Sequence, residues 1–486
     1  GSEGILIPDR VVTDSIPRRA KIVVTLGPAT DGLEHDLVAS GLDVARLNFS
    51  HGEPEEHRRR CAAIRAAAAD LGRCVAVMQD LPGPKIRTGR LVGGGPVDLT
   101  AGQTLVIANG DFVGNSSRIS ATYPALADDV RPGNTLLVDD GRIRLTVVET
   151  SHDEVRARVE QGGPLGEHKG INAPGAAISA TVPTKADVRD LRFGLSELEV
   201  DYVALSFIRT AEEVRTVRKL VRELKSDTSL VVKLEKEEAI HHLDAILKVA
   251  DAVMVARGDL GVELAPERVP ALQKRIIRRA NELSMPVITA TQMLESMTHD
   301  ETPTRAEAAD VANAVWDGTD AVMLSGETAV GRHPLLVLEM MDRIVRSAES
   351  TAIASVTFPT RRDKSHEAAI THAARVLAED LQARAIVGLT RTGRTARLLS
   401  SGRASCPTYA FSPDQRVCNR LSLWWGISPV FQPMGRTFEE NIRAMEEALC
   451  ARRAVAPDDL VVVTGSQPFE PGVHTNFVKF HRVGCR

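Results

Sequence analysis

A lysine and a glutamate stand two residues apart in the run VVKLEKEEAI, at Lys233 and Glu235. Residues two apart on a β-strand point to the same face, so this spacing would place a cation and a carboxylate in one pocket. A second carboxylate, Asp259, lies in MVARGDLGVE on a glycine-flanked turn whose exposed amides could accept an anion. Two carboxylates in one water-filled pocket are the usual protein share of a Mg²⁺ site, whose other ligands are substrate oxygens and water.

Basic residues could place positive charge around the same pocket. Arg46, Arg87 and Lys233 would surround a phosphoryl group there. Transfer of a phosphoryl group relies mostly on positioning and on electrostatic stabilisation. The residue types therefore favour a phosphoryl transfer that depends on Mg²⁺ or Mn²⁺.

Eight short apolar or β-branched runs, separated by helical stretches, would position these residues. Strands buried on both faces and alternating with helices are typical of a closed parallel barrel, which holds about eight strands in roughly 250 residues. The runs are KIVVTLGP, VARLNFS, VAVMQDL, YVALSF, LVVKLE, AVMVARGD, VITATQ and AVMLSGE. We therefore predict the α/β class with a (β/α)8 TIM barrel.

Each run ends in polar residues, and the C-terminal ends of such strands form the mouth where active sites lie. The residues expected at this mouth are Thr25, Arg46, Asn48, Ser50, Asp80, Lys233, Glu235, Asp259, Thr291, Ser325 and Glu327.

Two segments depart from the barrel pattern. Residues 88–184 alternate apolar and polar side chains between Gly, Asn and Asp turns, which predicts an inserted β-barrel lid domain over the mouth. From residue 351 to residue 486, helical stretches alternate with apolar runs, which predicts an open C-terminal α/β domain. The barrel would then comprise 18–87 and 185–350, and residues 1–17 an N-terminal segment whose first residues are consistent with a tag remnant.

The composition of the 486-residue chain is globular, with 43% hydrophobic residues, 26% charged residues and a net charge of -4. This net charge does not indicate a surface for binding polyanions, so nucleic acid is a poor candidate for a partner. No apolar run approaches the length needed to span a bilayer, so a membrane is a poor candidate too. The six cysteines include no C-x-x-C pair, which favours reduced thiols in a cytosol over a disulfide framework or a zinc site. The start of the chain lacks the features of a signal peptide. We expect a cytoplasmic protein.

The chain resembles the pyruvate kinases over nearly its whole length after residue 18. The matching segments are KIVVTLGPAT, GLDVARLNFSHG, GPKIRTG, HKGINAPG, SFIR, VARGDLGVE, ATQMLESM, PTRAEAADVANAVWDGTDAVMLSGETA and TGSQPFEPG. One segment alone is weak evidence, but their order around an inserted β lobe is highly specific. The resemblance implies a barrel, a lid and a C-terminal domain, and transfer of phosphate from phosphoenolpyruvate to ADP, giving pyruvate and ATP.

The resemblance also implies roles for individual residues. Glu235 and Asp259 match the divalent-metal ligands, and Lys233 matches the lysine that stabilises the phosphoryl group in flight. Arg46 matches the arginine that contacts the phosphate. Thr291 resembles the hydroxyl that helps to deliver a proton to the enolate, with a water chain as the ultimate acid. The implied substrate contacts are Arg46, Lys233, Gly258, Asp259, Thr291 and Ser325, and the implied nucleotide contacts are Asn48, Phe49, Ser50, His51, Arg87 and Lys169.

A second binding site is expected in the C-terminal domain, where TRTGRTAR follows a strand and opens a helix. Hydroxyls, a glycine and arginines at a helix N-terminus could hold a phosphate. The alternative is an ordinary capped turn. The family's allosteric sugar-phosphate loop lies at this position, and the family resemblance also implies a homotetramer. The implied residues for a phosphorylated allosteric effector are Thr390, Arg391, Thr392, Gly393, Arg394 and Thr395.

Three residues depart from the usual family pattern. Lys236 stands where an asparagine usually follows the Lys-x-Glu motif, and Ala239 stands where a glycine usually follows Glu238. His333 replaces a usual tyrosine. The first two departures bear on rate or nucleotide affinity more than on reaction type.

A further difference concerns K⁺, which many relatives require and hold among oxygens at the positions of Asn48, Ser50, Asp80 and residue 81. Those relatives typically have threonine at 81 and glutamate at 85, whereas this chain has Leu81 and Lys85 in the stretch DLPGPKIRTG. An ammonium about 4 Å from K⁺ would repel it by about 4 kcal/mol at an effective dielectric of about 20. We therefore expect Lys85 to substitute for K⁺. The alternative is a surface lysine on a turn.

Two other functions are alternatives to phosphoryl transfer. A barrel aldolase could use Lys233 to form a Schiff base with a keto acid, but this requires a neutral amine, and neighbouring carboxylates hold a lysine protonated. A non-enzymatic metabolite sensor would be expected to lose some of Lys233, Glu235, Asp259 and Thr291, all of which are present.

Overall fold

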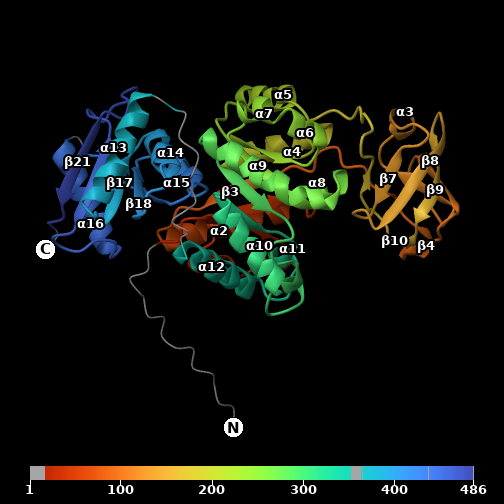
Figure 1. Ribbon diagram of the computed structural model, residues 1–486, viewed down its shortest axis with the longest axis horizontal. Helices are drawn as coiled ribbons and strands as arrows, with labels where there is room; N and C mark the ends of the chain where they lie inside the picture. The colour runs from red at the N-terminus through yellow and green to blue at the C-terminus, as the bar shows by residue number, and fades with distance from the viewer. Residues whose placement is uncertain (1–16, 352–362, 364, 436, 485–486) are drawn as a thin grey trace, which may run out of the picture. The chain divides into compact units, whose positions relative to one another are not determined.

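The computed structural model describes residues 17–351, 363, 365–435 and 437–484. The expected tag remnant therefore lies outside the described residues. The chain divides into two compact units (Figure 1). One unit spans residues 21–360, and the other joins residues 1–20 to 361–486.

Eight parallel strands close a barrel in the first unit, in the order β1-β16-β15-β14-β13-β12-β3-β2. Their side chains are almost all buried, as expected for strands covered on both faces. The predicted barrel is therefore confirmed. The strands are β1 (Lys21–Leu26), β2 (Val44–Asn48), β3 (Ala76–Asp80), β12 (Tyr202–Leu205), β13 (Ser229–Leu234), β14 (Ala252–Ala256), β15 (Val287–Ala290) and β16 (Ala321–Leu324).

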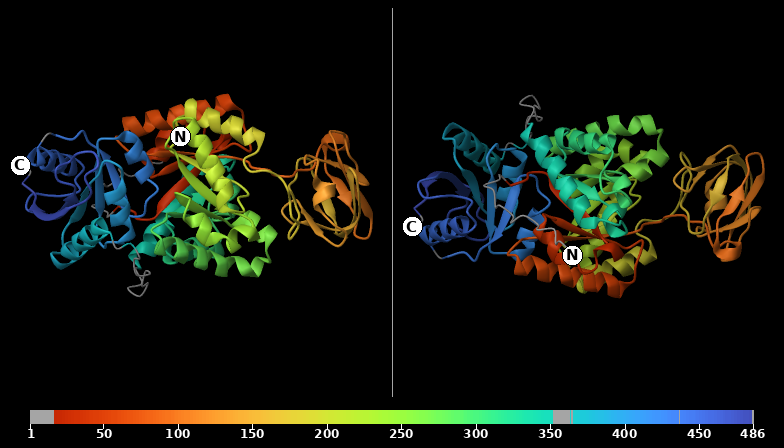
Figure 2. Two further views of the ribbon diagram at one scale, coloured as in Figure 1. Left: turned by 90° about the horizontal axis from the view of Figure 1, so that it is seen from above. Right: turned by 90° about the horizontal axis from the view of Figure 1, so that it is seen from below.

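Amphipathic helices cover the outside of the barrel in both views of Figure 2. In α5, Val214, Val217 and Val221 recur at helical spacing and are buried. Two short helices, α8 (Arg257–Glu263) and α11 (Gly326–Ala329), follow β14 and β16 at the mouth. The other helices of the barrel are α1 (Glu34–Ala39), α2 (Pro54–Asp70), α4 (Lys185–Ser196), α5 (Ala211–Glu223), α6 (Glu237–His241), α7 (Leu243–Leu247), α9 (Val269–Glu282), α10 (Arg305–Trp316) and α12 (Pro334–Ser350).

The inserted β domain follows β3 and is confirmed. A six-stranded sheet, in the order β11-β7-β8-β9-β5-β6, and a two-stranded sheet of β10 and β4 contribute to one apolar core. In β9, Val155, Ala157 and Val159 are buried and alternate with outward-facing residues. Its elements are β4 (Val97–Leu99), β5 (Thr104–Asn109), β6 (Arg118–Ala121), α3 (Leu126–Asp129), β7 (Thr135–Val138), β8 (Ile143–Ser151), β9 (Glu154–Gln161), β10 (Gly163–Leu165) and β11 (Ile171–Asn172).

The second unit contains the predicted α/β domain, which is also confirmed. Its sheet has the order β19-β18-β17-β20-β21, and only the β20–β21 pair is antiparallel. Sequence patterns did not identify β19 and β21, which are the two edge strands. The elements are α13 (His366–Asp380), β17 (Ala385–Leu389), α14 (Arg394–Ser401), β18 (Thr408–Ser412), α15 (Gln415–Leu421), β19 (Ile427–Phe431), α16 (Phe438–Ala451), β20 (Leu460–Gly465) and β21 (Phe477–Arg482).

The cysteines differ from expectation at one position. Cys61, Cys74, Cys406 and Cys418 are reduced, but Cys450 is disulfide-bonded. The expectation of reduced thiols is therefore wrong for Cys450, because spacing along the chain does not show which cysteines the fold brings within bonding distance.

Among the described residues, no helix is both long and apolar enough to cross a membrane.

Candidate active site

A buried cluster of four charged side chains occupies the barrel mouth. On β13, the Nζ atom of Lys233 donates hydrogen bonds to Ser206 Oγ at 2.8 Å and to Asp80 Oδ1 at 3.3 Å. The same Nζ lies 2.9 Å from Glu235 Oε1. The two-residue spacing thus places Lys233 and Glu235 in one pocket, as predicted.

Arg46 joins this cluster from β2. Its Nε donates to Asp80 Oδ2 at 2.7 Å, and its Nη1 donates to Thr25 Oγ1 at 2.9 Å. Asp80 ends β3 and is 1% exposed, so its carboxylate lies between two cations away from water. Burial alone would raise the pKa of Asp80, but the charges of Lys233 and Arg46 outweigh it and lower that pKa.

The neighbouring groups also decide the charge of Lys233. Burial favours the neutral amine, but the carboxylates of Asp80 and Glu235 outweigh it and raise the pKa of Lys233. Lys233 is therefore an ammonium ion at neutral pH. Burial, reinforced by the charge of Asp259, raises the pKa of Glu235 against the opposing effect of Lys233.

The two carboxylate oxygens of Glu235 have different surroundings. Its Oε2 accepts a hydrogen bond from the backbone N–H of Phe207 at 2.7 Å. Its Oε1 is buried, and its close neighbour among the described residues is the Lys233 ammonium, at ion-pair distance. A buried carboxylate oxygen is suited to bind a cation.

The second predicted metal ligand, Asp259, lies in the first turn of α8, and its side chain is 25% exposed. Within the described ranges, no group of three or more His, Cys, Asp or Glu residues is arranged to hold a metal ion. Glu235 and Asp259 are the two carboxylates that the protein would supply, with substrate and water completing the shell. This donor set of oxygens fits Mg²⁺ or Mn²⁺.

Gly258 and Thr291 lie together beside Asp259. The backbone N–H of Gly258 donates to Thr291 Oγ1 at 2.7 Å. Thr291 has a φ of 69°, in the left-handed region, and its carbonyl accepts from Arg257 Nη2 at 2.7 Å. The Gly258 amide expected to bind a substrate carboxylate is thus bonded to Thr291 in this structure.

Ser325 lies at the end of β16, where α11 begins. Its backbone N–H donates to Glu327 Oε2 at 2.7 Å. Its Oγ is buried and makes no hydrogen bond with the described residues. This hydroxyl therefore has unused hydrogen-bonding capacity.

The predicted nucleotide residues after β2 form one ordered loop. Asn48 Oδ1 accepts from the N–H of Ser50 at 3.1 Å. The ring of Phe49 stacks on His57 with centroids 4.2 Å apart, and His57 Nε2 lies 2.9 Å from the carbonyl of His51. Burial, with the positive charges of Arg87, Arg46 and Lys85, lowers the pKa of His51.

Arg87 and Lys169 lie on the two linkers of the inserted domain. Arg87 forms an antiparallel bridge with Gly170, and its Nη1 donates to the carbonyl of His168 at 3.0 Å. Lys169 Nζ lies 3.1 Å from Asp139 Oδ1. Their charged groups thus bond to residues of the inserted domain rather than to the buried cluster.

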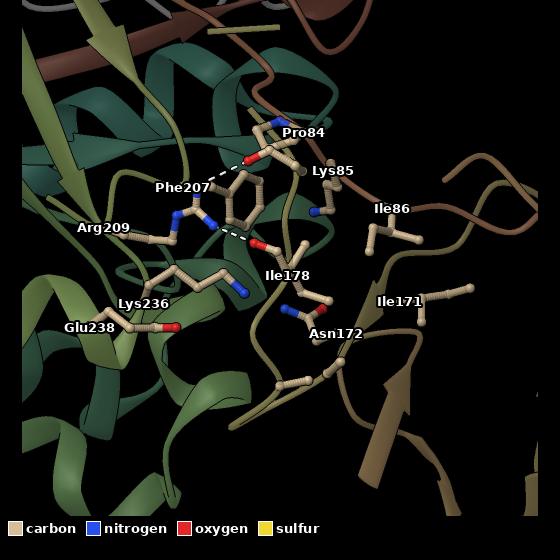
Figure 3. Close-up of a pocket in the computed structure, with 13 residues that line it drawn as sticks. Pro84, Lys85, Ile86, Ile171, Asn172, Ile178, Phe207, Arg209, Lys236 and Glu238 are labelled. Atoms are coloured by element: carbon tan, nitrogen blue, oxygen red, sulfur yellow. Dashed lines mark hydrogen bonds between the residues drawn. The ribbon is translucent and has the colours of Figure 1, made fainter. Parts of the chain in front are cut away.

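Lys85 lies on the first linker, and its ammonium points to the side of Phe207 (Figure 3). Its Nζ lies 3.8 Å from Asp259 Oδ1, and its side chain is 27% exposed. A Cβ atom added at Gly170 would come within 3.2 Å of Lys85 Cε, so the lysine stem lies close to the second linker. Leu81 is 2% exposed, and its carbonyl accepts from Ser206 Oγ at 2.7 Å. Lys85 is therefore not a surface lysine on an isolated turn.

The predicted effector loop belongs to the second unit. Thr390 Oγ1 accepts from the N–H of Gly393 at 2.9 Å, and Gly393, with a φ of 86°, precedes α14 without a side-chain cap. Arg394 lies 3.6 Å from Glu367. Thr395 Oγ1 lies 2.7 Å from Thr475 Oγ1.

The other two effector-loop residues also have neighbours. Arg391 Nη2 donates to the carbonyl of Phe469 at 3.1 Å, and its guanidinium lies over the Phe469 ring. The carbonyl of Thr392 accepts from Arg397 Nη2 at 3.4 Å.

Three residues that no sequence pattern indicated also hold the site together. Ser206 and Phe207 follow β12 and bond to Lys233 and Glu235, and His57 supports the loop after β2. Ser206, which directly follows the apolar part of YVALSF, was a usable signal, because polar residues also follow the other barrel strands. The hydrogen bond from Phe207 to Glu235 uses the backbone N–H, which every residue but proline has, so the identity of the residue could not predict it.

Fold and site together define an α/β-barrel enzyme with a buried cluster of paired charges at its mouth. The family model described as pyruvate kinase, barrel domain, matches residues 17–338, and that described as pyruvate kinase, alpha/beta domain, matches residues 368–481. The chain belongs to the pyruvate kinase family, and it is a phosphotransferase.

The similarity extends over almost the whole chain. It is 44% identical over 472 residues to a pyruvate kinase of Corynebacterium efficiens, covering 96% of this chain and 98% of the relative. It is 43% identical over 471 residues to one of Mycobacterium tuberculosis, covering 96% and 99%. The crystal structure of a pyruvate kinase from Cryptosporidium parvum superposes with a TM-score of 0.88 at 34% identity, covering 97% of this chain and 99% of that one.

The buried cluster predicts a large stability effect of Asp80→Asn. This change leaves two buried cations, Arg46 and Lys233, without their shared partner, which should lower the free energy of unfolding by about 3–5 kcal/mol. The matched control is Asp111→Asn, which removes an exposed ion pair with Arg90 and should have little effect. Urea unfolding of the three proteins measures the difference, and equal losses in the two variants would contradict the account.

The lowered pKa of Asp80 predicts how this difference varies with pH. A carboxylate whose pKa falls on folding adds stability that is fully present above its unfolded value, here 3.8, and that is lost as pH falls through the folded value. The difference between wild type and Asp80→Asn should therefore stay constant from about pH 7 to about pH 5. A difference that shrinks over this interval would show that the pKa of Asp80 is raised instead.

Proposed function

We propose that this protein transfers the phosphoryl group of phosphoenolpyruvate to ADP, giving pyruvate and ATP in the final step of glycolysis, and that it requires Mg²⁺ or Mn²⁺. The observation that carries the proposal is the ammonium of Lys233, held charged between Asp80 and Glu235 at the mouth of the barrel. A cation fixed in a buried site stabilises a phosphoryl group in transit without reorganising at the moment of reaction.

The surrounding residues have separate tasks in this proposal. Arg46 contacts the phosphate and Lys233 stabilises the phosphoryl group, while Glu235 and Asp259 hold the divalent cation. When bound, that cation supplies positive charge against the phosphoryl oxygens. Asn48 to His51, Arg87 and Lys169 contact the nucleotide.

The three-carbon part of the substrate lies beside Gly258 and Asp259, whose amides and the hydroxyl of Ser325 orient its carboxylate. The Gly258 amide is bonded to Thr291 Oγ1 in the structure. A bound substrate carboxylate takes over this amide, and the threonine hydroxyl is then free to donate its proton to the enolate carbon. A threonine of ordinary pKa is not the ultimate acid, and water replenishes this proton.

The raised pKa of Lys233 argues against a barrel aldolase. A Schiff base requires a neutral amine, and Asp80 and Glu235 hold Lys233 in the charged form. Borohydride trapping in the presence of pyruvate would label Lys233 if the aldolase function were correct.

We also propose that Lys85 removes the need for K⁺. Its ammonium lies 3.8 Å from Asp259 and close enough to His51 to lower the pKa of that imidazole, so it carries positive charge into the predicted phosphate region. Leu81 is buried and, unlike a threonine, has no side-chain oxygen to offer a monovalent cation.

The proposal includes regulation by a phosphorylated effector at Thr390 to Thr395 in a cytoplasmic homotetramer. The uncapped start of α14 leaves backbone amides for an anion. The Thr395 hydroxyl is already hydrogen-bonded to Thr475, so it would hold the loop in place rather than bind the effector. Sedimentation velocity tests the tetramer.

The first functional prediction is that the purified protein makes pyruvate and ATP only with a divalent cation. Lys233→Met should lower kcat by about 100-fold or more with a smaller change in KM, because the charge acts mainly on the transition state. The matched control is Lys219→Met at an exposed helix position. Full activity after exhaustive chelation, or a change in KM alone, would contradict the assigned roles.

The second functional prediction is activity with tetramethylammonium as the only monovalent cation. Adding KCl at constant ionic strength should change the rate by less than about tenfold, equivalent to about 1.4 kcal/mol. The variant Lys85→Glu with Leu81→Thr should lose activity without K⁺ and regain part of it when K⁺ is added. Strong K⁺ activation of the wild type would refute the substitution.

The third functional prediction concerns the effector loop. Arg394→Ala with Thr392→Ala should abolish activation by whichever phosphorylated metabolite activates the wild type, whereas Arg416→Ala, at an exposed position outside the loop, should retain it. The coupling free energy should be about 1–3 kcal/mol. An unchanged activator response in the double variant would count against this loop.

A further inference from the structure

Lys236, the residue after Glu235 in the chain, is buried in a second ionic contact behind the site. Its Nζ donates to Glu263 Oε1 at 2.7 Å, and only 15% of the lysine side chain and 4% of the glutamate side chain are exposed. In Figure 3 the Lys236 side chain extends past Phe207 toward Asn172. These three residues line a cavity of about 40 Å³ at the base of the inserted domain.

Three parts of the fold meet at the carboxylate of Glu263. Lys236 comes from the loop after β13, and Glu263 is the last residue of α8. The same Oε1 of Glu263 accepts from Asn172 Nδ2 at 3.0 Å, and Asn172 ends β11 on the linker that leaves the inserted domain. One oxygen thus fixes the loop, the helix and the linker through charge-assisted hydrogen bonds.

Lys236 also contacts the residue that holds Glu235. Its Nζ lies 5.6 Å from the centre of the Phe207 ring, within the range of a cation–π interaction. Phe207 has a φ of 59°, a left-handed conformation that a non-glycine residue keeps only when its surroundings impose it. That conformation accompanies the 2.7 Å hydrogen bond from its N–H to Glu235 Oε2.

Lys236 therefore contacts one neighbour of each carboxylate in the site. Through Phe207 it constrains Glu235, and through Glu263 it constrains α8, whose first turn carries Asp259. We propose that Lys236 is a positioning residue that sets the separation of Glu235 and Asp259 for a divalent cation, and that it couples this separation to the linker at Asn172. The inference rests on the proposed role of Glu235 and Asp259 as metal ligands.

The test is Mn²⁺ binding to the full-length protein without substrates, followed by electron paramagnetic resonance. Lys236→Met keeps the length of the side chain but removes its charge, and should weaken Mn²⁺ binding about 10- to 100-fold, as loss of groups that support metal ligands typically does. Lys236→Arg should recover most of the affinity, because its guanidinium can still bond to Glu263 and lie over Phe207. Lys219→Met should bind Mn²⁺ like the wild type.

A second variant guards against misfolding of Lys236→Met. Glu263→Gln keeps an acceptor for Asn172 but removes the ion pair, and it should weaken Mn²⁺ binding in the same direction. Thermal unfolding is measured in parallel. If both variants unfold at lower temperature but bind Mn²⁺ as tightly as the wild type, Lys236 has only a structural role and the inference is wrong.

Glu235→Gln separates this failure from failure of the proposed function. If Glu235→Gln weakens Mn²⁺ binding and Lys236→Met does not, the proposed metal site is supported and only the positioning role of Lys236 is wrong. If the wild type binds no Mn²⁺, or Glu235→Gln leaves binding unchanged, the proposed metal site is wrong and the inference falls with it.

Discussion

The barrel mouth depends on the mutual neutralisation of four charged side chains that are removed from water. Moving each ion out of water costs several kcal/mol, and a close partner offsets this only when the remaining hydrogen bonds are also made. Here two cations, Arg46 and Lys233, alternate with two carboxylates, Asp80 and Glu235. Strands β2, β3 and β13 of a closed parallel barrel bring them together, so the cluster requires the whole barrel to form.

This balance also explains what the site can accept. The two buried cations and the two buried carboxylates already cancel each other's charge. An anionic substrate is therefore best accommodated together with a cation that neutralises it. The more exposed rim provides for both, since Asp259 offers a carboxylate to a metal ion and Lys85 places an ammonium 3.8 Å away from it. A phosphorylated substrate and a divalent cation would therefore favour each other's binding, as the proposed phosphoryl transfer requires.

Sequence patterns predicted the parts of this arrangement that depend on periodicity. The eight buried runs gave the barrel, and the spacing of Lys233 and Glu235 placed both in one pocket. The pattern could not show that Asp80 would bridge two cations, because that contact joins residues from separate strands. Nor could it show the left-handed backbone of Phe207, which the packing around it imposes. The edge strands β19 and β21 escaped notice because one contains a proline and the other has charged, partly exposed residues.

The most direct measurement is the ionisation of Lys233 itself, followed by NMR with ¹³C at the lysine Cε position and assigned by comparison with Lys233→Arg. The account predicts that Lys233 remains an ammonium ion at pH values up to and above 10.5, the ordinary lysine pKa, because Asp80 and Glu235 outweigh the effect of burial. Deprotonation of Lys233 near neutral pH would contradict the account, since the site would then hold a neutral amine in place of the fixed charge on which the proposed phosphoryl transfer depends.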